Sequence, residues 1–265
     1  MGASACGELA LLASVAEPNY GILTNIGLAH LEGFGGPEGV RRGKGELFDF
    51  LAANGGHAFV PADDEILTGM AAERDSLAAE YYSASLADGI ENHLEGSYNR
   101  FNIAAAVAVG HYFDVPDERI RHAIASYVPD NNRSQRIGTS RNTLVADCYN
   151  ANPQSMSAAL RVLAASEGKK IAVLGDMKEL GELTESAHRA MGELCALLGI
   201  DRVIAVGEYA RGIADAAHES AEWYPDAESA VDAARAAFTE GSVLLCKASH
   251  SMHLEKIVEE LLKTT

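Results

Sequence analysis

The sequence predicts an α/β protein in two parts, of which the second contains a mostly parallel sheet with helices on both faces. Three observations lead to this prediction. From Asn142 onward, short apolar strand-like runs alternate regularly with helix-like segments, a pattern that indicates parallel strands joined by crossover helices. The runs are apolar throughout, as in strands that are buried on both faces. The polar segment 130–140 separates them from a less regular first part and predicts a domain boundary.

The first part combines a few buried strands with helices and a long glycine-rich stretch. In its clearest helix, over 99–113, apolar residues recur at helical spacing. The expected elements, in chain order, are a strand over 20–26, a Gly-rich loop over 27–45, a helix over 46–53, a strand over 57–60 that ends at Pro61, and helices over 99–113 and 116–127.

The second part alternates strand and helix to its end. We expect strands over 144–146, 171–174, 203–206 and 243–246, and helices over 153–165, 184–198, 209–217, 227–238 and 254–262.

Composition excludes some classes of protein. The 265 residues include 21 Lys and Arg against 38 Asp and Glu, a net charge of −17, which argues against a general nucleic-acid binder because such proteins cluster basic residues. No apolar run approaches the roughly 18–20 residues that span a bilayer, and the N-terminus does not resemble a signal peptide. The four scattered cysteines predict reduced thiols in a cytoplasmic protein.

Polar and glycine residues follow each of the four predicted strands of the second part. Ligands of parallel α/β sheets bind beyond the carboxyl ends of the strands, so this recurrence favours a binding edge. Any one of these residues could instead serve in a turn or cap a helix. The four segments are Asp147 with 149–153, Gly175–Gly181, Gly207-Glu208, and Lys247–His250.

The first part offers two pairs of candidate residues. His30 follows the first predicted strand and Lys44 enters a helix, although alone the histidine is more typical of a hydrogen-bonded loop residue and the lysine of a solvated surface residue. Asn99 and Asn102 lie three apart in a predicted helix, so both amides face the same way. Such amides suit a purine edge, and capping of the helix by Asn99 is the alternative.

The sequence contains no P-loop. The pattern G-x-x-x-x-G-K-[ST] fails around Gly43 and Lys44, because Glu38 stands where the first glycine is needed and Gly45 stands where the hydroxyl is needed.

Several segments together resemble the ATP-dependent Mur ligases of bacterial cell-wall synthesis, and among them the ligases that add D-Ala-D-Ala to UDP-MurNAc-tripeptide. The resemblance runs nearly end to end, and its Tyr-Asn-Ala-Asn-Pro and Gly-Asp-Met segments are the most specific. The matching segments are Thr24–Gly35, Lys44–Phe48, Gly96–Ala106, Tyr149–Met156 and Leu174–Gly181, with His188 downstream.

The resemblance implies a fold of which this chain carries a part. The family has a uridine-nucleotide domain, a central ATPase domain and a Rossmann-like C-terminal domain. Residues 1–137 resemble the second half of the central domain, with a partial sheet, and residues 138–265 resemble the whole C-terminal domain. We therefore expect a fragment that is inactive alone because the P-loop lies outside it.

The implied reaction forms a peptide bond. ATP phosphorylates the terminal carboxylate of the UDP-MurNAc-tripeptide, and the amine of D-Ala-D-Ala attacks the acyl phosphate. This order is chemically reasonable because a carboxylate is a poor electrophile and phosphate is a good leaving group, while metal ions and cations stabilise the developing charge. ATP and Mg²⁺ are the implied cofactors.

The resemblance also assigns roles to individual residues. In the first part, His30 resembles a magnesium ligand, Lys44 the lysine that the family carbamylates, and Asn99 and Asn102 the adenine-side pair. Arg133 resembles the arginine near ATP phosphate, with Arg136 as a rival, and Asp147 the residue that reaches the ribose. The residues on the D-Ala-D-Ala and peptide side are Asn150, Asn152, Ser155, Met156, Lys247 and Ser249.

Two positions depart from the family pattern or carry no implied role. The family's Lys-Gly-Ser-Arg motif reads Lys247-Ala248-Ser249-His250 here, and a titratable His replaces the always-charged Arg. Lys178 occupies a variable position and receives no role.

Two other functions remain open. A Rossmann-type dinucleotide oxidoreductase would need G-x-G-x-x-G after the first strand of the second part, which residues 150–153 do not supply. A non-catalytic association module would expose a large apolar patch. We expect the full-length family member to be monomeric, whereas unpaired edges of a partial sheet could make the fragment dimerise.

Overall fold

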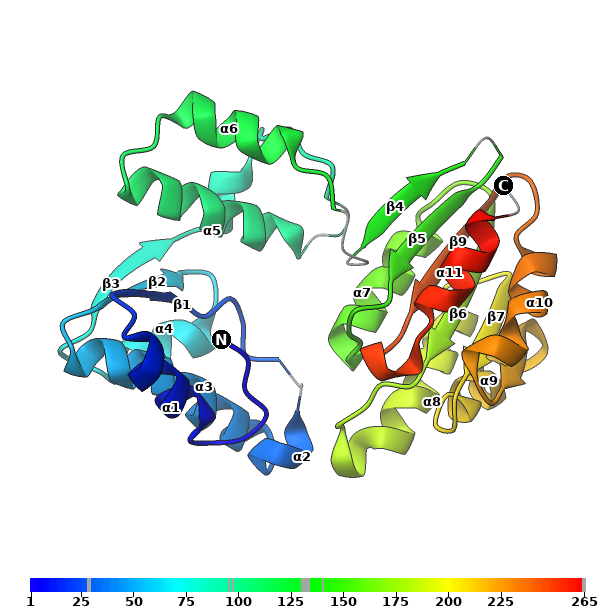
Figure 1. Cartoon of the computed structure of the whole chain (residues 1–265), viewed down its shortest axis with the longest axis horizontal. Coiled ribbons are helices and arrows are strands. Elements are labelled where there is room, and N and C mark those ends of the chain that lie inside the picture. Colours follow the sequence, from blue (N-terminus) through cyan, green and yellow to red (C-terminus); the bar gives the residue numbers. More distant parts are fainter. Residues whose placement is uncertain (28–29, 95, 97, 130–133, 140, 264–265) are drawn as a thin grey trace. The chain divides into compact units, whose positions relative to one another are not determined.

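The computed structural model describes residues 1–27, 30–94, 96, 98–129, 134–139 and 141–263. It divides into two compact units (Figure 1), of which unit 1 comprises residues 1–93 with 97–127, and unit 2 comprises 94–96 with 128–265. The boundary expected between residues 137 and 138 falls inside strand β4 (Gln135–Gly138). This strand belongs to unit 2 because it pairs with β5 (Thr143–Asp147).

Unit 1 is built around a three-stranded parallel sheet in the order β1-β2-β3. Its strands are β1 (Tyr20–Ile22), β2 (His57–Pro61) and β3 (Ala78–Tyr82). Its helices are α1 (Glu8–Ala16), α2 (Leu31–Phe34), α3 (Pro37–Ala53), α4 (Glu65–Ala72), η1 (Ala84–Ala87), α5 (Asn99–Tyr112) and α6 (Asp117–Ser126).

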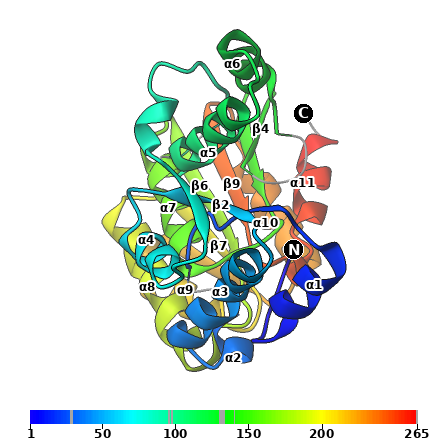
Figure 2. The ribbon, with the colours of Figure 1, turned by 90° about the vertical axis from the view of Figure 1, so that its left-hand side faces the viewer.

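Side chains of β2 alternate between two small cores, as the period of two in a strand requires. Ala58 and Val60 pack with buried residues of α3 and α4, whereas Phe59 packs with Ala104 and Ala108 of α5 on the other face. Helix α1 lies against α3 (Figure 1 and Figure 2). Unit 1 is therefore a sheet with helices on both faces.

The Gly-rich loop expected over 27–45 is a wrong prediction for most of its length, because α2 spans Leu31–Phe34 and α3 begins at Pro37. Proline at the first helical position is favourable, since its ring fixes a helical φ and no N–H is lost from the helix. The glycines permit close packing: a Cβ on Gly39 would lie 1.8 Å from the carbonyl oxygen of Phe34, and one on Gly43 would lie 2.4 Å from the Phe34 ring. The predicted helix is thus only the second half of α3.

Unit 2 contains a six-stranded sheet in the order β4-β5-β9-β6-β7-β8. All neighbours pair in parallel except β4, which is antiparallel to β5. The further strands are β6 (Lys169–Gly175), β7 (Arg202–Val206), β8 (Ala221–Tyr224) and β9 (Ser242–Lys247). The helices are α7 (Pro153–Ala164), η2 (Gly181–Leu183), α8 (Thr184–Leu197), α9 (Arg211–Ala217), η3 (His218–Ser220), α10 (Ala227–Ala237), η4 (His250–Met252) and α11 (Glu255–Leu262).

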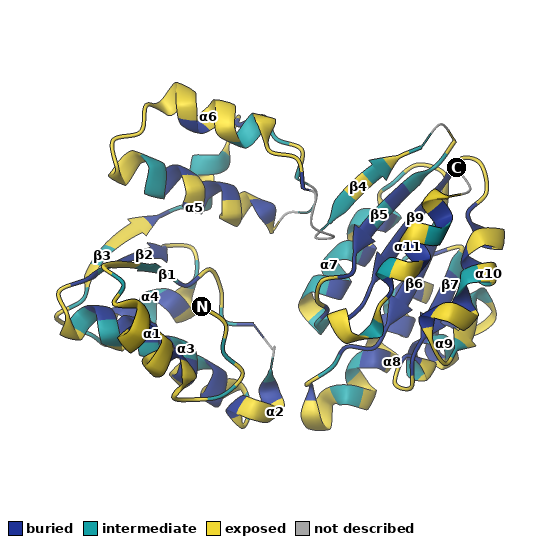
Figure 3. Ribbon diagram, in the orientation of Figure 1, coloured by how far each residue is buried: buried dark blue, intermediate teal, exposed yellow. Residues whose placement is uncertain are grey.

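Helices cover both faces of this sheet, which confirms the predicted mostly parallel α/β fold. One face packs against α7, α8 and α9 through Ala172, Ala205 and Leu245, among others. The other packs against α10 and α11 through residues such as Leu244 and Cys246. The central strands are accordingly buried along most of their length (Figure 3).

After the neighbouring strands β5 and β9, the chain continues on opposite faces of the sheet. Helix α7, which follows β5, lies on one face, and α11, which follows β9, lies on the other. Such a switch point opens a crevice at the carboxyl ends of the two strands. Asp147 ends β5 and Lys247 ends β9, so the candidate residues lie where the fold places a ligand site.

Within the residues that the structure describes, no helix combines the length and the apolar character needed to cross a membrane.

Candidate functional site

Asp147 and Lys247 form a buried ion pair at the switch point of unit 2. They are register partners of β5 and β9, and the Lys247 Nζ lies 2.6 Å from Asp147 Oδ2. The same ammonium donates to the backbone oxygen of Asn150 at 3.0 Å, and the backbone N–H of Ser134 donates to Asp147 Oδ1 at 3.1 Å. The structure therefore brings together three residues that the sequence placed on one binding edge.

The segment after Asn150 builds the N-terminus of α7. Asn152 caps the helix: its Oδ1 accepts from the Ser155 N–H at 2.8 Å, and its own N–H donates to Ser155 Oγ at 3.1 Å. Met156 is fully buried in the core beneath the sheet, and Asn150 Oδ1 accepts from the N–H of Ala151 at 2.8 Å. Of these residues Asn150 contacts Lys247, and the local hydrogen bonds already satisfy polar atoms of Asn150, Asn152 and Ser155.

Asp176, to which the sequence analysis gave no role, joins three loops at the same edge. The residue is fully buried; its Oδ1 accepts from the N–H of Ala210 at 2.7 Å, and its Oδ2 pairs with the Lys178 Nζ at 2.7 Å. Its backbone oxygen accepts from the N–H of Ser249 at 3.1 Å, and Ser249 Oγ accepts from the N–H of Lys178 at 3.0 Å. An aspartate directly after a buried strand was the available sequence signal.

His188 fixes the loop that follows Asp176. Its Nε2 accepts from the N–H of Met177 at 2.9 Å, so Nδ1 carries the proton and donates to the Thr184 oxygen at 2.6 Å. Burial lowers the pKa of this imidazole, although the hydrogen bond to Thr184 opposes the shift. His188 is a neutral structural residue at this position.

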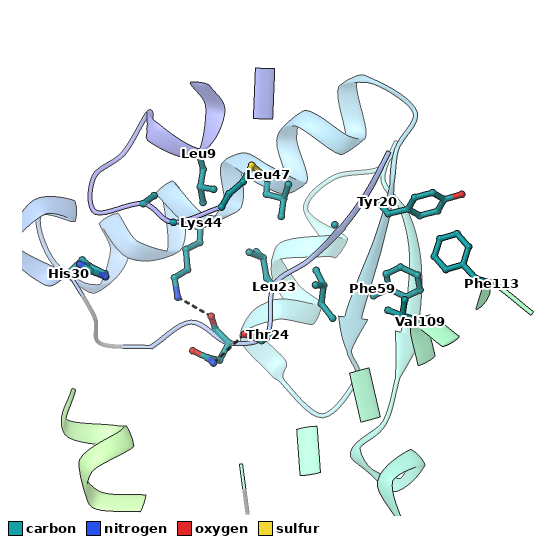
Figure 4. A pocket seen from close by; sticks show the side chains of 16 residues that line it. Leu9, Tyr20, Leu23, Thr24, His30, Lys44, Leu47, Phe59, Val109 and Phe113 are labelled. Atoms are coloured by element: carbon teal, nitrogen blue, oxygen red, sulfur yellow. Dashed lines mark hydrogen bonds between the residues drawn. The ribbon is translucent and has the colours of Figure 1, made fainter. Parts of the chain in front are cut away.

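Unit 1 contains a pocket of about 590 Å³ that both His30 and Lys44 line (Figure 4). The Lys44 side chain extends into it, and its Nζ donates to the backbone oxygen of Asn25 at 3.1 Å. Burial lowers the pKa of the Lys44 ammonium. The remaining lining is mainly apolar and includes Leu9, Tyr20, Ile22, Leu23, Leu47, Phe59, Val109 and Phe113.

The donor set in this pocket is incomplete for a metal ion. Among the residues that the structure describes, no group of three or more His, Cys, Asp or Glu side chains could hold one. His30 supplies an imidazole, but an ammonium such as that of Lys44 has no lone pair. A carbamate on Lys44 would convert this donor into an oxygen ligand, which Mg²⁺ prefers. The pair therefore fits a magnesium site only in the modified form.

The residues next to Lys44 have structural roles. Glu46 was not singled out by sequence, yet its carboxylate accepts from the N–H groups of Gly7 at 2.6 Å and Ala10 at 2.9 Å, at the start of α1. A Cβ on Gly45 would lie 2.9 Å from the Arg74 guanidinium. Glu46 thus holds the start of α1 against α3, and the neighbouring Lys44 lines the pocket.

The two asparagines of α5 lie on one side of the helix, as their spacing predicts. Asn102 Nδ2 donates to Asn99 Oδ1 at 2.9 Å on the first turn of α5, so the two amides face the same way. Neither residue lines the pocket of His30 and Lys44. Arg133, the predicted phosphate contact, lies outside the described residues.

Comparison with known families accounts for most of the chain. Residues 1–92 match the Mur ligase middle domain, and residues 132–250 match the glutamate ligase domain of Mur ligases.

Curated relatives are similar over the whole sequence. The UDP-N-acetylmuramoyl-tripeptide–D-alanyl-D-alanine ligase of Bacillus subtilis is 32% identical over 291 residues, which cover 100% of this chain and 64% of that protein. The enzyme of the same name from Escherichia coli is 30% identical, over 98% of this chain and 64% of its own length. The chain thus spans less than two thirds of these relatives.

Solved structures show the same relationship. MurF from Acinetobacter baumannii superposes with a TM-score of 0.86 at 26% identity, over 99% of this chain and 64% of that one. MurF from Thermotoga maritima, solved with ADP, gives a TM-score of 0.84 at 25% identity, over 99% and 66%.

Proposed function

The chain belongs to the Mur ligase family, and from this premise we propose that it is part of an ATP-dependent ligase that joins D-Ala-D-Ala to UDP-MurNAc-tripeptide. The observation that carries the proposal is the contact of Lys247 with Asp147 and Asn150 at the switch point of unit 2. The curated relatives that bear the name of this ligase match nearly the whole length of the chain.

The proposed reaction proceeds through an acyl phosphate. The tripeptide carboxylate attacks the γ-phosphorus of ATP, and ADP leaves. The amine of D-Ala-D-Ala then attacks the acyl carbon, loses its proton, and expels phosphate from the tetrahedral intermediate. Bound Mg²⁺ would neutralise phosphate charge in this chemistry.

In unit 1 we assign His30 and Lys44 to a magnesium site. The amine of Lys44 would attack carbon dioxide and release a proton, which leaves a carbamate whose oxygens can bind the ion. The placement of both side chains on one pocket supports this assignment. Asn99 and Asn102 would present their paired amides to adenine.

In unit 2 we assign Asp147 to the ribose and the surrounding residues to the peptide. Among the described residues, each carboxylate oxygen of Asp147 has one donor, and because an ionised carboxylate has about four acceptor positions, it can accept further hydrogen bonds. The remaining residues that we assign to the peptide side are Asn150, Asn152, Ser155 and Ser249, whereas Met156 and Lys247 are buried and would support this side from within the protein.

We further propose that these 265 residues alone do not catalyse the ligation. They contain no G-x-x-x-x-G-K-[ST] segment, whose backbone N–H groups would hold the ATP phosphates. A cytoplasmic location follows from the nucleotide-linked substrates, and the four free cysteines agree with it.

A chimera tests the proposed activity. The 265 residues replace the matching residues of the Bacillus subtilis relative, and ligation of D-Ala-D-Ala to UDP-MurNAc-tripeptide is measured beside the chain alone. ATP-dependent product from the chimera and none from the chain would support both parts of the proposal. A folded chimera without product would reject the ligase assignment, and product from the chain alone would reject the need for a P-loop.

The same preparations test the association-module alternative. We expect the chain to bind ATP only weakly. Its mass in solution shows whether it dimerises. A stable complex with another protein together with an inactive, folded chimera would favour the module over the ligase.

A further inference from the structure

Two lysine–aspartate pairs lie at the carboxyl edge of unit 2, and they differ in exposure. The Lys247 side chain is 2% exposed, and it donates both to Asp147 and to the Asn150 oxygen. The Lys178 side chain is 37% exposed, while its partner Asp176 is buried. Lys247 is therefore enclosed by protein, whereas about a third of the Lys178 side chain is open to solvent.

Three contacts hold Lys178 in place. Its Nζ lies 2.7 Å from Asp176 Oδ2 and 4.8 Å from the centre of the Tyr209 ring. Its backbone N–H donates to Ser249 Oγ at 3.0 Å. Asp176 is itself fixed by the N–H of Ala210. The flexible lysine stem thus starts from an ordered loop and ends between a carboxylate and an aromatic face.

The ammonium retains the capacity to bind an anion. It has three donors, and the described contacts give one of them to Asp176.

We infer that Lys178 binds the C-terminal carboxylate of the amine substrate at this edge. The inference deepens the proposed function, because D-Ala-D-Ala carries a carboxylate at the end opposite its reactive amine. Ser249 connects Lys178 to the strand that ends in Lys247, so the carboxylate of the dipeptide would be held on the same edge as the proposed peptide site.

The test compares two ligands and three forms of the 265-residue chain. The dissociation constants of D-Ala-D-Ala and of D-alanyl-D-alaninamide, which lacks the carboxylate, are measured by NMR titration on the unchanged chain, Lys178→Gln and Lys169→Gln. Lys169 is an exposed lysine at the opposite end of β6, so its replacement removes the same charge outside the proposed site.

We expect Lys178→Gln to weaken dipeptide binding about tenfold, the effect of losing a hydrogen bond to a charged group. Binding of the amide should not change, and Lys169→Gln should bind both ligands as the unchanged chain does. Fluorescence of Trp223, the only tryptophan of the chain, checks that unit 2 remains folded.

Other results overturn the inference in distinct ways. Equal dipeptide binding by the unchanged chain and Lys178→Gln would leave the proposed function intact and remove Lys178 from the site. Weaker binding of both ligands would assign Lys178 a purely structural role. Failure of the unchanged chain to bind either ligand would reject the dipeptide site in unit 2 and the Lys178 inference with it.

Discussion

Asp147 Oδ2 lies 2.6 Å from the Nζ of Lys247, and this contact joins the ends of β5 and β9 inside the protein. A buried ion pair does not guarantee stability, because removing both charges from water costs several kcal/mol per ion. The loss of one partner is costly, however, since the other charge then remains buried without compensation.

We therefore predict that Lys247→Met destabilises unit 2 by about 3–5 kcal/mol. The double variant Asp147→Leu with Lys247→Met should recover most of this loss, because no buried charge remains. Urea unfolding followed by Trp223 fluorescence measures both, and Trp223 lies in β8 of unit 2. A double variant no more stable than the single one would contradict this account of the pair.

His188 should make unit 2 sensitive to acid. Burial lowers its pKa below the ordinary value of 6.5, so below about pH 6.5 the unfolded chain binds a proton that the folded chain does not. The free energy of unfolding should then fall as the pH falls from that value to the folded-state pKa, by at most about 1.4 kcal/mol per pH unit.

Urea midpoints measured at several pH values between about 5 and 7.5 check this dependence. His188→Gln should flatten the part of the slope that His188 causes. His250→Gln, which replaces an exposed histidine, should leave it unchanged. If His250→Gln flattened the slope and His188→Gln did not, the buried imidazole would not be its source.

The parallel sheet of unit 2 could be predicted from sequence because its strands are uniformly apolar and buried. Ile171 to Leu174 show no exposure, and short apolar runs that alternate with helical segments are typical of parallel strands covered on both faces. Strand β3, with the sequence Ala-Ala-Glu-Tyr-Tyr, was missed because it lies at the edge of its sheet and most of its residues are at least partly exposed. Edge strands lack both the apolar run and a strict alternation.

From sequence, residues of the candidate site could be placed near one another only where they end or follow predicted parallel strands. Asp147 and Lys247 are far apart in sequence, but both end neighbouring parallel strands, and the fold then brings them together. The role of Asp176 was not predicted, because its partners Ala210 and Lys178 become apparent only once the loops have folded. The glycines of α3 were predicted to lie in a loop for a similar reason, since nothing in the neighbouring sequence indicates that they pack tightly on Phe34 within a helix.

Asn152 provides a direct test of structural against substrate-binding roles. As the N-cap of α7, its replacement in Asn152→Ala should lower the stability of unit 2 by about 1 kcal/mol. Asn152→Asp keeps the capping oxygen and should retain nearly full stability. Urea unfolding measures this difference, and the dipeptide affinity of Asn152→Asp then reports the amide's own contribution. A stable Asn152→Ala variant would contradict the capping role.

Two glycines of unit 1 lie in helices but in opposite surroundings. A Cβ on Gly39 of α3 would lie 1.8 Å from the backbone oxygen of Phe34, whereas one on Gly69 of α4 would have no atom within 4 Å. Gly39→Ala must displace backbone and should cost at least about 2 kcal/mol. Gly69→Ala should instead stabilise its helix by about 0.5–1 kcal/mol, because alanine is the better helix former.

Hydrogen exchange read by mass spectrometry on peptides of α3 and α4 measures both effects, since unit 1 contains no tryptophan. Exchange in α3 should accelerate in Gly39→Ala and that in α4 should slow in Gly69→Ala. The two changes have the same chemistry, so only the difference in packing can give them opposite signs. Unchanged protection of α3 in Gly39→Ala would mean that α2 and α3 do not pack closely, and the glycine-rich stretch would then behave as the loop that its composition suggests.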